Sequence, residues 1–185
     1  MISTFPRLET DRMILRQLRS EDAPNLFENF STDEVTQYYN LDNFVAIEQA
    51  EQLIERWNQR FEEGQSSIRW GIALRSEDRI IGTCGYHNWR RADCKAEIGY
   101  ELNPSHWNKG LMTEALNRIV AFGFEEMQLN RIEAYVFGTN TASQKLLEKS
   151  GFYQEGLLQE CYRKNDRFID AILFAKLQKD YAENG

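Results

Sequence analysis

A strand-like segment that runs directly into a helix places the strongest constraint on how this chain folds. Residues 95–102 alternate in the manner of a strand and stop before Pro104, and apolar residues from Leu116 to Met127 then recur at helical spacing. The first N–H groups of such a helix have no partner within it, and with the positive end of the helix dipole they attract anions. Gly110, in the connecting loop, lets the backbone approach a bulky group closely. The stretch is typical of a phosphate-binding loop, although an ordinary strand-to-helix turn has the same pattern.

The segment before this stretch predicts two helices and an antiparallel hairpin. Apolar residues recur every three or four positions from Ile47 to Phe61, and Gly64 follows as a stop signal. Pro24 is tolerated in the first turn of the earlier helix. The expected elements are a strand at 13–18, helices at 20–30 and 47–61, and paired strands at 67–74 and 79–86.

The segment after this stretch predicts a β-α-β unit followed by two more strands. Thr141 to Gln144 fits a capping box for a helix that ends at Gly151. The strands around it are expected at 131–137, 152–160 and 167–174. Because no linker or internal repeat is visible, we predict a single domain over residues 1–185. The fold class is α+β, with a mixed sheet and helices on both faces.

The composition excludes several classes of protein. The 185 residues carry 22 basic and 29 acidic side chains, a formal net charge of −7, which argues against a nucleic-acid-binding surface. An acidic chain favours a cationic substrate, although many soluble proteins carry as much charge. No apolar run approaches the roughly 18 residues of a membrane helix, and no signal-peptide pattern begins the sequence. Three cysteines without metal-type spacing indicate reduced thiols and no metal site, so we expect a cytoplasmic protein.

Four local segments, in the order and at the intervals seen here, resemble the GCN5-related N-acetyltransferase (GNAT) superfamily. The similarity is greatest to its ribosomal-protein (RimJ/RimL-like) branch. The segments are Leu8-Glu-Thr-Asp-Arg-Met-Ile-Leu-Arg16, Ala96-Glu-Ile-Gly-Tyr100, Trp107-Asn-Lys-Gly-Leu-Met-Thr-Glu-Ala115, and Asn140-Thr-Ala-Ser143 with Glu148-Lys-Ser-Gly-Phe152. The resemblance implies a twisted, mostly antiparallel sheet of about six to seven strands. It also implies a splay between the fourth and fifth strands, at 95–102 and 131–137.

The resemblance implies acetyl-CoA as co-substrate and no metal. In this family the loop corresponding to 107–113 wraps the pyrophosphate, the pantetheine arm pairs with the strand backbone, and the next helix contacts the sulfur end. The matching residues are Glu101, Leu102, Trp107, Asn108, Lys109, Gly110, Leu111, Met112, Thr113, Asn140 and Ser143. One departure is Trp107, since many relatives carry Gln or Arg at that position.

Acetyl transfer to an amine requires a neutral nitrogen, a polarised carbonyl and a proton for the departing thiolate. A backbone N–H freed where the strands splay can polarise the carbonyl, and a carboxylate can accept the amine proton. Strand alternation places Glu97 and Glu101 on one face but about 13 Å apart along the strand. Glu97 matches the base of histone-acetylating relatives, and its alternative role is a strand-face Glu paired to a basic side chain.

The acid and the second candidate base are less constrained by the sequence. Many family members use a Tyr on the helix after Asn140, but Leu147 stands at that position here. Ser143, one turn earlier, is therefore the candidate that protonates the thiolate, or it only contacts the cofactor. His87 follows a strand and is either a base, a substrate contact or a structural residue.

The acceptor is inferred from the energetics of deprotonation and from the resemblance. At pH 7 a peptide α-amine needs roughly 1 kcal/mol to lose its proton, whereas a lysine amine needs about 4.6 kcal/mol. The sequence therefore predicts an N-acetyltransferase that acts on a protein N-terminal α-amine, such as that of a ribosomal protein, by direct transfer in a ternary complex. The alternatives are a polyamine or antibiotic amine as acceptor, or a catalytically silent coenzyme-A sensor. We expect a monomer or a homodimer.

Overall fold

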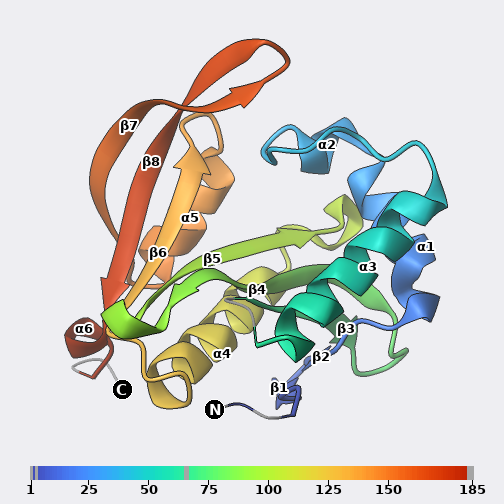
Figure 1. Ribbon diagram of the computed structural model, residues 1–185, viewed down its shortest axis with the longest axis horizontal. Helices are drawn as coiled ribbons and strands as arrows, with labels where there is room; N and C mark the ends of the chain where they lie inside the picture. The colour runs from blue at the N-terminus through green and yellow to red at the C-terminus, as the bar shows by residue number, and fades with distance from the viewer. Residues whose placement is uncertain (1, 3, 65–66, 183–185) are drawn as a thin grey trace.

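The computed structural model describes residues 2, 4–64 and 67–182, and its centre is an eight-stranded sheet (Figure 1). The strand order is β1-β2-β3-β4-β5-β6-β8-β7, and every pair is antiparallel except β5 with β6. The strands are β1 (Leu8–Glu9), β2 (Met13–Arg16), β3 (Ile68–Leu74), β4 (Ile80–Arg90), β5 (Lys95–Leu102), β6 (Arg131–Phe137), β7 (Tyr153–Lys164) and β8 (Arg167–Leu177). The strand beyond the seven expected is β1, whose two residues are too short to show alternation.

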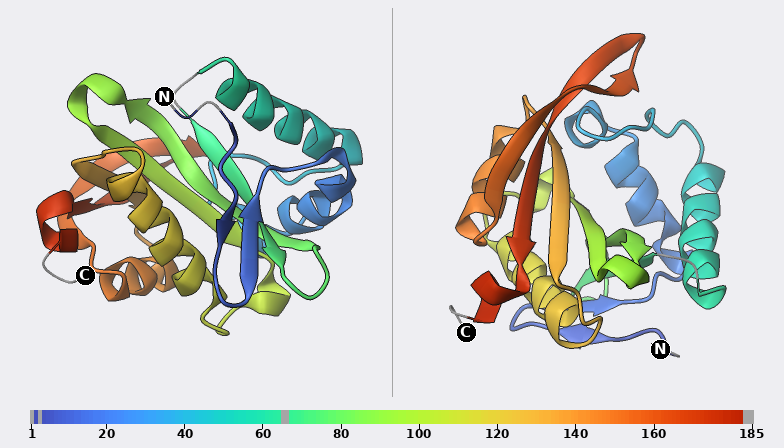
Figure 2. Two further views of the ribbon diagram at one scale, coloured as in Figure 1. Left: turned by 90° about the horizontal axis from the view of Figure 1, so that it is seen from below. Right: turned by 60° about the vertical axis from the view of Figure 1, so that its left-hand side comes forward.

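Helices cover both faces of the sheet, as predicted (Figure 2). They are α1 (Ala23–Phe30), α2 (Asp33–Thr36), α3 (Ile47–Glu62), α4 (Leu111–Glu125), α5 (Thr141–Lys149) and α6 (Gln178–Ala182). Successive residues of β3 point to opposite faces: Ile72 joins the core under α4 and α5, whereas Ala73 joins the core under α1 and α3. No helix in the described part of the chain is long and apolar enough to cross a membrane.

The cap of α5 differs from the one predicted. Asn140 is the N-cap, and its Oδ1 accepts a hydrogen bond from the backbone N–H of Ser143 at 3.1 Å. The capping box at Thr141 was wrong, because that residue already lies inside the helix. Asn and Thr are both common N-cap residues, so the pattern alone predicts the start of the helix only to within one residue.

The predicted splay lies between β5 and β6. The two strands pair only from Lys95 opposite Arg131 to Glu97 opposite Glu133, and they then diverge (Figure 1). β6 stays paired with β8 along its whole length, while β5 stays paired with β4. The edge of β5 that follows Glu97 is therefore left without a neighbour on the β6 side.

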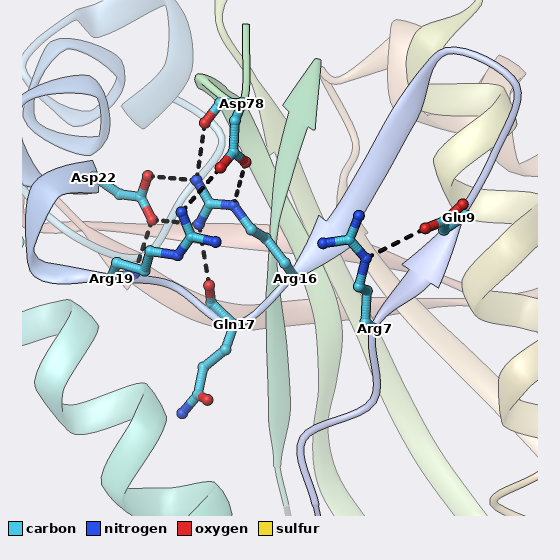
Figure 3. Close-up of polar contacts among 7 residues, drawn as sticks. All are labelled: Arg7, Glu9, Arg16, Gln17, Arg19, Asp22 and Asp78. Atoms are coloured by element: carbon cyan, nitrogen blue, oxygen red, sulfur yellow. Dashed lines mark hydrogen bonds and ion pairs between the residues drawn. The ribbon is translucent and has the colours of Figure 1, made fainter. Parts of the chain in front are cut away.

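A buried arginine ties the N-terminal segment to the sheet. Arg16 of β2 lies between Asp22, in the 3₁₀ turn before α1, and Asp78, in the turn between β3 and β4 (Figure 3). Its guanidinium donates to the two Asp22 oxygens at 2.7 and 2.9 Å, to Asp78 Oδ1 at 2.7 Å, and to the carbonyls of Gln17 and Asp78. The N–H of Arg19 adds a bond to Asp22 Oδ2. We call Arg16, Asp22 and Asp78 the Arg16 cluster.

The β7–β8 hairpin arches toward the segment that follows α2 (Figure 1). Lys164, at its tip, donates from Nζ to the carbonyl oxygens of Tyr39 at 2.6 Å, of Leu41 at 3.1 Å and of Thr36. Desolvation in this contact lowers the pKa of Lys164, although Asp42 and Asp33 oppose the shift. The contact joins the C-terminal hairpin to the N-terminal helical segment across the gap between β5 and β6.

Candidate active site

A cavity of about 610 Å³ lies where the end of β5, the start of α4 and the start of α5 meet. The segment around Tyr38 and Tyr39 forms its remaining wall. Each residue that the sequence assigned to the cofactor lines this cavity: Glu101, Leu102, Trp107, Asn108, Lys109, Gly110, Leu111, Met112, Thr113, Asn140 and Ser143. The structure therefore brings these residues together, whereas Glu97 and His87 are not among the described residues that line the cavity.

The loop before α4 has the backbone conformation that an anion site requires. Asn108 and Gly110 adopt positive φ angles of 59° and 72°, and Gly110 is the N-cap of α4. A glycine cap provides no side-chain acceptor for the first N–H groups of the helix. These first residues of α4 line the cavity, and their N–H groups with the positive end of the α4 dipole suit a phosphate group.

Arg12, in the turn between β1 and β2, holds this loop in place. Its Nη1 donates to the carbonyl of Lys109 at 2.9 Å, and its Nε donates to Glu114 Oε2 at 2.7 Å. The backbone N–H of Arg12 also donates to Glu114 Oε1 at 3.0 Å. Burial raises the pKa of Glu114, but hydrogen bonds from Thr10 and Arg12 outweigh it and lower the pKa. Arg12 and Glu114 were not predicted as site residues, although both belong to segments that carry the resemblance.

Positive charge and an open strand edge extend the site away from the loop. Lys109, Lys145 and Lys149 all line the cavity, and they offer cations to phosphate groups. The indole N–H of Trp107 donates to the carbonyl of Leu102 at 2.7 Å, so the departure at Trp107 serves to anchor the end of β5. Because that carbonyl is engaged, the part of β5 that is free to pair with a ligand lies before Leu102.

Two hydroxyl groups meet in the lining of the cavity. The Ser143 Oγ and Tyr100 Oη atoms lie 2.7 Å apart, and the Asn140 cap fixes the backbone of Ser143. Burial raises the pKa of Tyr100, although the bond to Ser143 opposes the shift. Leu147, at the position where many family members carry a Tyr, is fully buried in the core. Strand alternation groups Tyr100 with Ala96 and Ile98, so no local pattern marks its hydroxyl as a partner of Ser143.

Glu97 and His87 form a cross-strand pair outside the cavity lining. They lie opposite each other in β5 and β4, with His87 Nε2 and Glu97 Oε2 3.3 Å apart. Burial raises the pKa of Glu97, but hydrogen bonds from His87 and Asn88 outweigh it and lower the pKa. The His87 side chain is 46% exposed, so the pair connects the vertex of the splay to solvent.

The Glu101 side chain is buried rather than directed at solvent. Its Oε2 lies 2.5 Å from Nη2 of Arg69, whose guanidinium stacks 5.1 Å from the ring centre of Trp57 on α3. Glu101 lines the cavity, as expected from the resemblance, and its side chain has its own set of partners. The signal in the sequence for this buried pair is Arg69 itself, a charged residue inside an otherwise apolar strand.

Comparison with protein families decides what kind of site this is. The family described as Acetyltransferase (GNAT) domain matches residues 12–153. The chain belongs to the GNAT acetyltransferase family. It is therefore an N-acetyltransferase, and the acetyl donor of the family, acetyl-CoA, fits the loop, the three lysines and the open strand edge around the cavity.

Individual relatives agree with this assignment. The chain is 43% identical over 171 residues to the uncharacterized N-acetyltransferase YoaA of Bacillus subtilis, covering 92% of this chain and 96% of the relative. It is 29% identical over 101 residues to the ribosomal-protein-serine acetyltransferase of Escherichia coli, covering 55% and 56%. A crystal structure of a GNAT-family acetyltransferase from Bacillus anthracis superimposes with a TM-score of 0.83 at 25% identity, covering 94% of this chain and 99% of that one.

Proposed function

We propose that this acetyltransferase moves an acetyl group from acetyl-CoA to the α-amine of a protein N-terminus, by direct transfer in a ternary complex in the cytoplasm. The observation that carries the proposal is the cavity where a phosphate-type loop, an open strand edge and a hydroxyl pair converge. The similarity to a ribosomal-protein-serine acetyltransferase supports a protein acceptor. Three free cysteines suit a reducing compartment.

The cofactor is assigned along the cavity from its cationic end to the hydroxyl pair. The N–H groups at the start of α4, with Lys109, Lys145 and Lys149, hold the phosphates. The unpaired edge of β5 holds the pantetheine arm through its backbone. When bound, acetyl-CoA supplies an activated thioester carbonyl.

We assign the two proton transfers to two different groups, Ser143 and Glu97. The amine nitrogen forms a bond to the carbonyl carbon as the carbon–sulfur bond breaks, so one proton leaves the amine and one must reach the thiolate. Ser143 donates the proton to sulfur, and its hydroxyl is in turn a partner of Tyr100. Glu97, which lies outside the cavity lining, accepts the amine proton through water, and half-exposed His87 passes it to solvent.

A thiol-release assay with an N-terminal peptide tests the proposal. Ser143→Ala is expected to lower kcat by about 100-fold, with acetyl-CoA affinity retained, because general acid catalysis contributes 10²–10⁴-fold. Glu97→Gln should lower kcat and remove the acidic limb of the pH profile. Glu51→Gln, an isosteric change on the exposed face of α3, is the matched control.

The proposal is wrong if wild-type protein binds acetyl-CoA but acetylates no amine in a panel of N-terminal peptides, polyamines and aminoglycosides. Preference for a polyamine or an aminoglycoside over every peptide would instead correct only the acceptor. Unchanged kcat in Ser143→Ala would remove the hydroxyl pair from the chemistry.

A further inference from the structure

Four polar side chains from separate elements meet behind the wall of the cavity. Arg69 of β3, Thr83 of β4, Glu101 of β5 and Tyr39 from the segment after α2 form what we call the Arg69 cluster. Arg69 donates to Thr83 Oγ1 at 2.7 Å and to Tyr39 Oη at 2.9 Å. A further bond from Nη1 to the Gly99 carbonyl, at 2.9 Å, connects the cluster to the open part of β5.

The two carboxylate oxygens of Glu101 differ in the number of hydrogen bonds that they accept in this cluster. Oε2 accepts three hydrogen bonds, from Arg69 Nη2 at 2.5 Å, Thr83 Oγ1 at 2.8 Å and Tyr39 Oη at 2.9 Å. Oε1 is equally buried, and it has no hydrogen-bond partner among the described residues. A buried carboxylate oxygen that lacks a donor has lost its hydration without compensation, so a donor from outside the chain is expected.

The position of Glu101 indicates where that donor comes from. Glu101 and Tyr39 both line the cavity that holds Ser143, whereas the lysines of the cavity lie on the loop before α4 and on α5. The lining of the cavity thus combines lysines suited to phosphate with a carboxylate residue suited to an N–H donor. On the same face of β5, Gly99 has no side chain, and Arg69 Nη1 and the His87 ring lie within 3.4 Å of where its Cβ would be.

We infer that Oε1 of Glu101 accepts a hydrogen bond from the amino group of the acceptor and makes Glu101 a specificity-determining residue. This inference rests on the proposed function and names how the amine is recognised. Arg69, Thr83 and Tyr39 fix the orientation of the carboxylate, so that Oε1 is left without a donor from the described residues. Because all three donors are directed at Oε2, the amine meets a preorganised acceptor at Oε1.

Glu101→Gln tests the inference with almost no change in shape. The three donors require an acceptor at the Oε2 position, so the amide oxygen must lie there and the NH₂ group must replace Oε1. The variant thereby presents a donor to the acceptor amine. We expect kcat/KM for the amine to fall at least about tenfold, while acetyl-CoA affinity measured by calorimetry stays within about twofold.

Glu51→Gln makes the same change in net charge on an exposed helix face and should leave both quantities unchanged. Unchanged kcat/KM in Glu101→Gln would overturn the inference and would assign Oε1 to an ordered water. A wild-type enzyme that acetylates no amine would instead overturn the proposed function, and the inference with it.

A second measurement uses the wild-type enzyme and so does not depend on folding of the variant. The N,N-dimethyl analogue of the best acceptor keeps one N–H when protonated, whereas the N,N,N-trimethyl analogue has none. We expect the trimethyl compound to inhibit at least about tenfold more weakly. Equal inhibition by the two analogues would contradict recognition through an N–H group.

Discussion

The Arg16 cluster and the Arg69 cluster are both buried arginine–carboxylate networks, but they differ in how completely their acceptors are used. Both oxygens of Asp22 accept hydrogen bonds in the Arg16 cluster (Figure 3). In the Arg69 cluster one oxygen of Glu101 accepts three bonds and the other accepts none from the described residues. The first network lies at the junction of β2 with α1, and the second lies at the wall of the cavity.

This difference separates a structural network from a ligand-binding one. Removing one partner of a fully hydrogen-bonded buried ion pair lowers the free energy of unfolding, because the other charge is left buried without compensation. A network in which one acceptor atom lacks a donor can accept a hydrogen bond from a substrate at that atom. The two clusters are therefore expected to respond differently when each loses a carboxylate or a donor.

The largest effect is expected for Asp22→Asn. The change removes the charge that faces Arg16, and both side chains of this pair are only 7% exposed. The free energy of unfolding should fall by about 3–5 kcal/mol, measured by urea denaturation. Thiol release per folded molecule should stay at the wild-type level, since the cluster lies away from the cavity-lining residues.

Arg7→Ala is the control for that variant. Arg7 forms an ion pair with Glu9 on the surface, where the two side chains are 55% and 49% exposed (Figure 3). No measurable loss of stability is expected, because water screens exposed pairs. If Arg7→Ala destabilised the protein as much as Asp22→Asn, the contribution of the Arg16 cluster to stability would not depend on its burial.

A smaller effect is expected when the Arg69 cluster loses one donor in Tyr39→Phe. The hydroxyl donates to Glu101 and accepts from Arg69, so its removal should lower the free energy of unfolding by about 1–2 kcal/mol. The kcat/KM for the amine should also fall about fivefold, because Glu101 is less firmly oriented. Tyr153→Phe, at a 63% exposed position of β7, is the matched control. If Tyr39→Phe lowered stability without changing kcat/KM, the Arg69 cluster would be a structural network like the Arg16 cluster.

The smallest effect is a difference in pH dependence between the two clusters. Hydrogen bonds from Arg16 lower the pKa of Asp78 below its ordinary 3.8, so its contribution to stability is present above pH 3.8 and is lost as the pH falls through the folded pKa. Burial raises the pKa of Glu101 above its ordinary 4.5, so ionisation of Glu101 lowers stability as the pH rises from 4.5 through the folded pKa.

Denaturation of wild type, Asp78→Asn and Glu101→Gln at several pH values would measure this. The stability difference between wild type and Asp78→Asn should shrink as the pH falls. The stability of wild type relative to Glu101→Gln should instead increase as the pH falls. Slopes of the same sign would contradict the opposite environments of the two carboxylates.

Local sequence patterns were sufficient to predict most of this fold. Helical spacing from Ile47 to Phe61 located α3, and alternation over residues 95–102 located β5. The splay followed from the resemblance and not from periodicity, since nothing in either strand's pattern specifies where pairing stops. β1 was missed because two residues cannot show a period, and the helix cap was displaced by one residue because Asn140 and Thr141 both suit that position.

The sequence predicted those parts of the site whose residues are close together in the chain. It did not predict contacts between residues that are far apart in the chain. The loop from Trp107 to Thr113 is contiguous, and it lines the cavity as expected. The Arg12 contact with Glu114 spans 102 residues, and the pairing of Arg69 with Glu101 spans 32. Such contacts depend on sheet register and on how helices pack, which a single sequence does not encode locally.

Acetylation of matched peptides, read by mass spectrometry, tests the central claim most directly. One peptide has a free α-amine and no lysine, and the other has a blocked α-amine and one lysine. With acetyl-CoA and wild-type enzyme, one acetyl group should appear on the first peptide and none on the second, because the α-amine loses its proton at lower cost. Acetylation of the lysine peptide alone, or of neither peptide, would contradict transfer to an N-terminal α-amine.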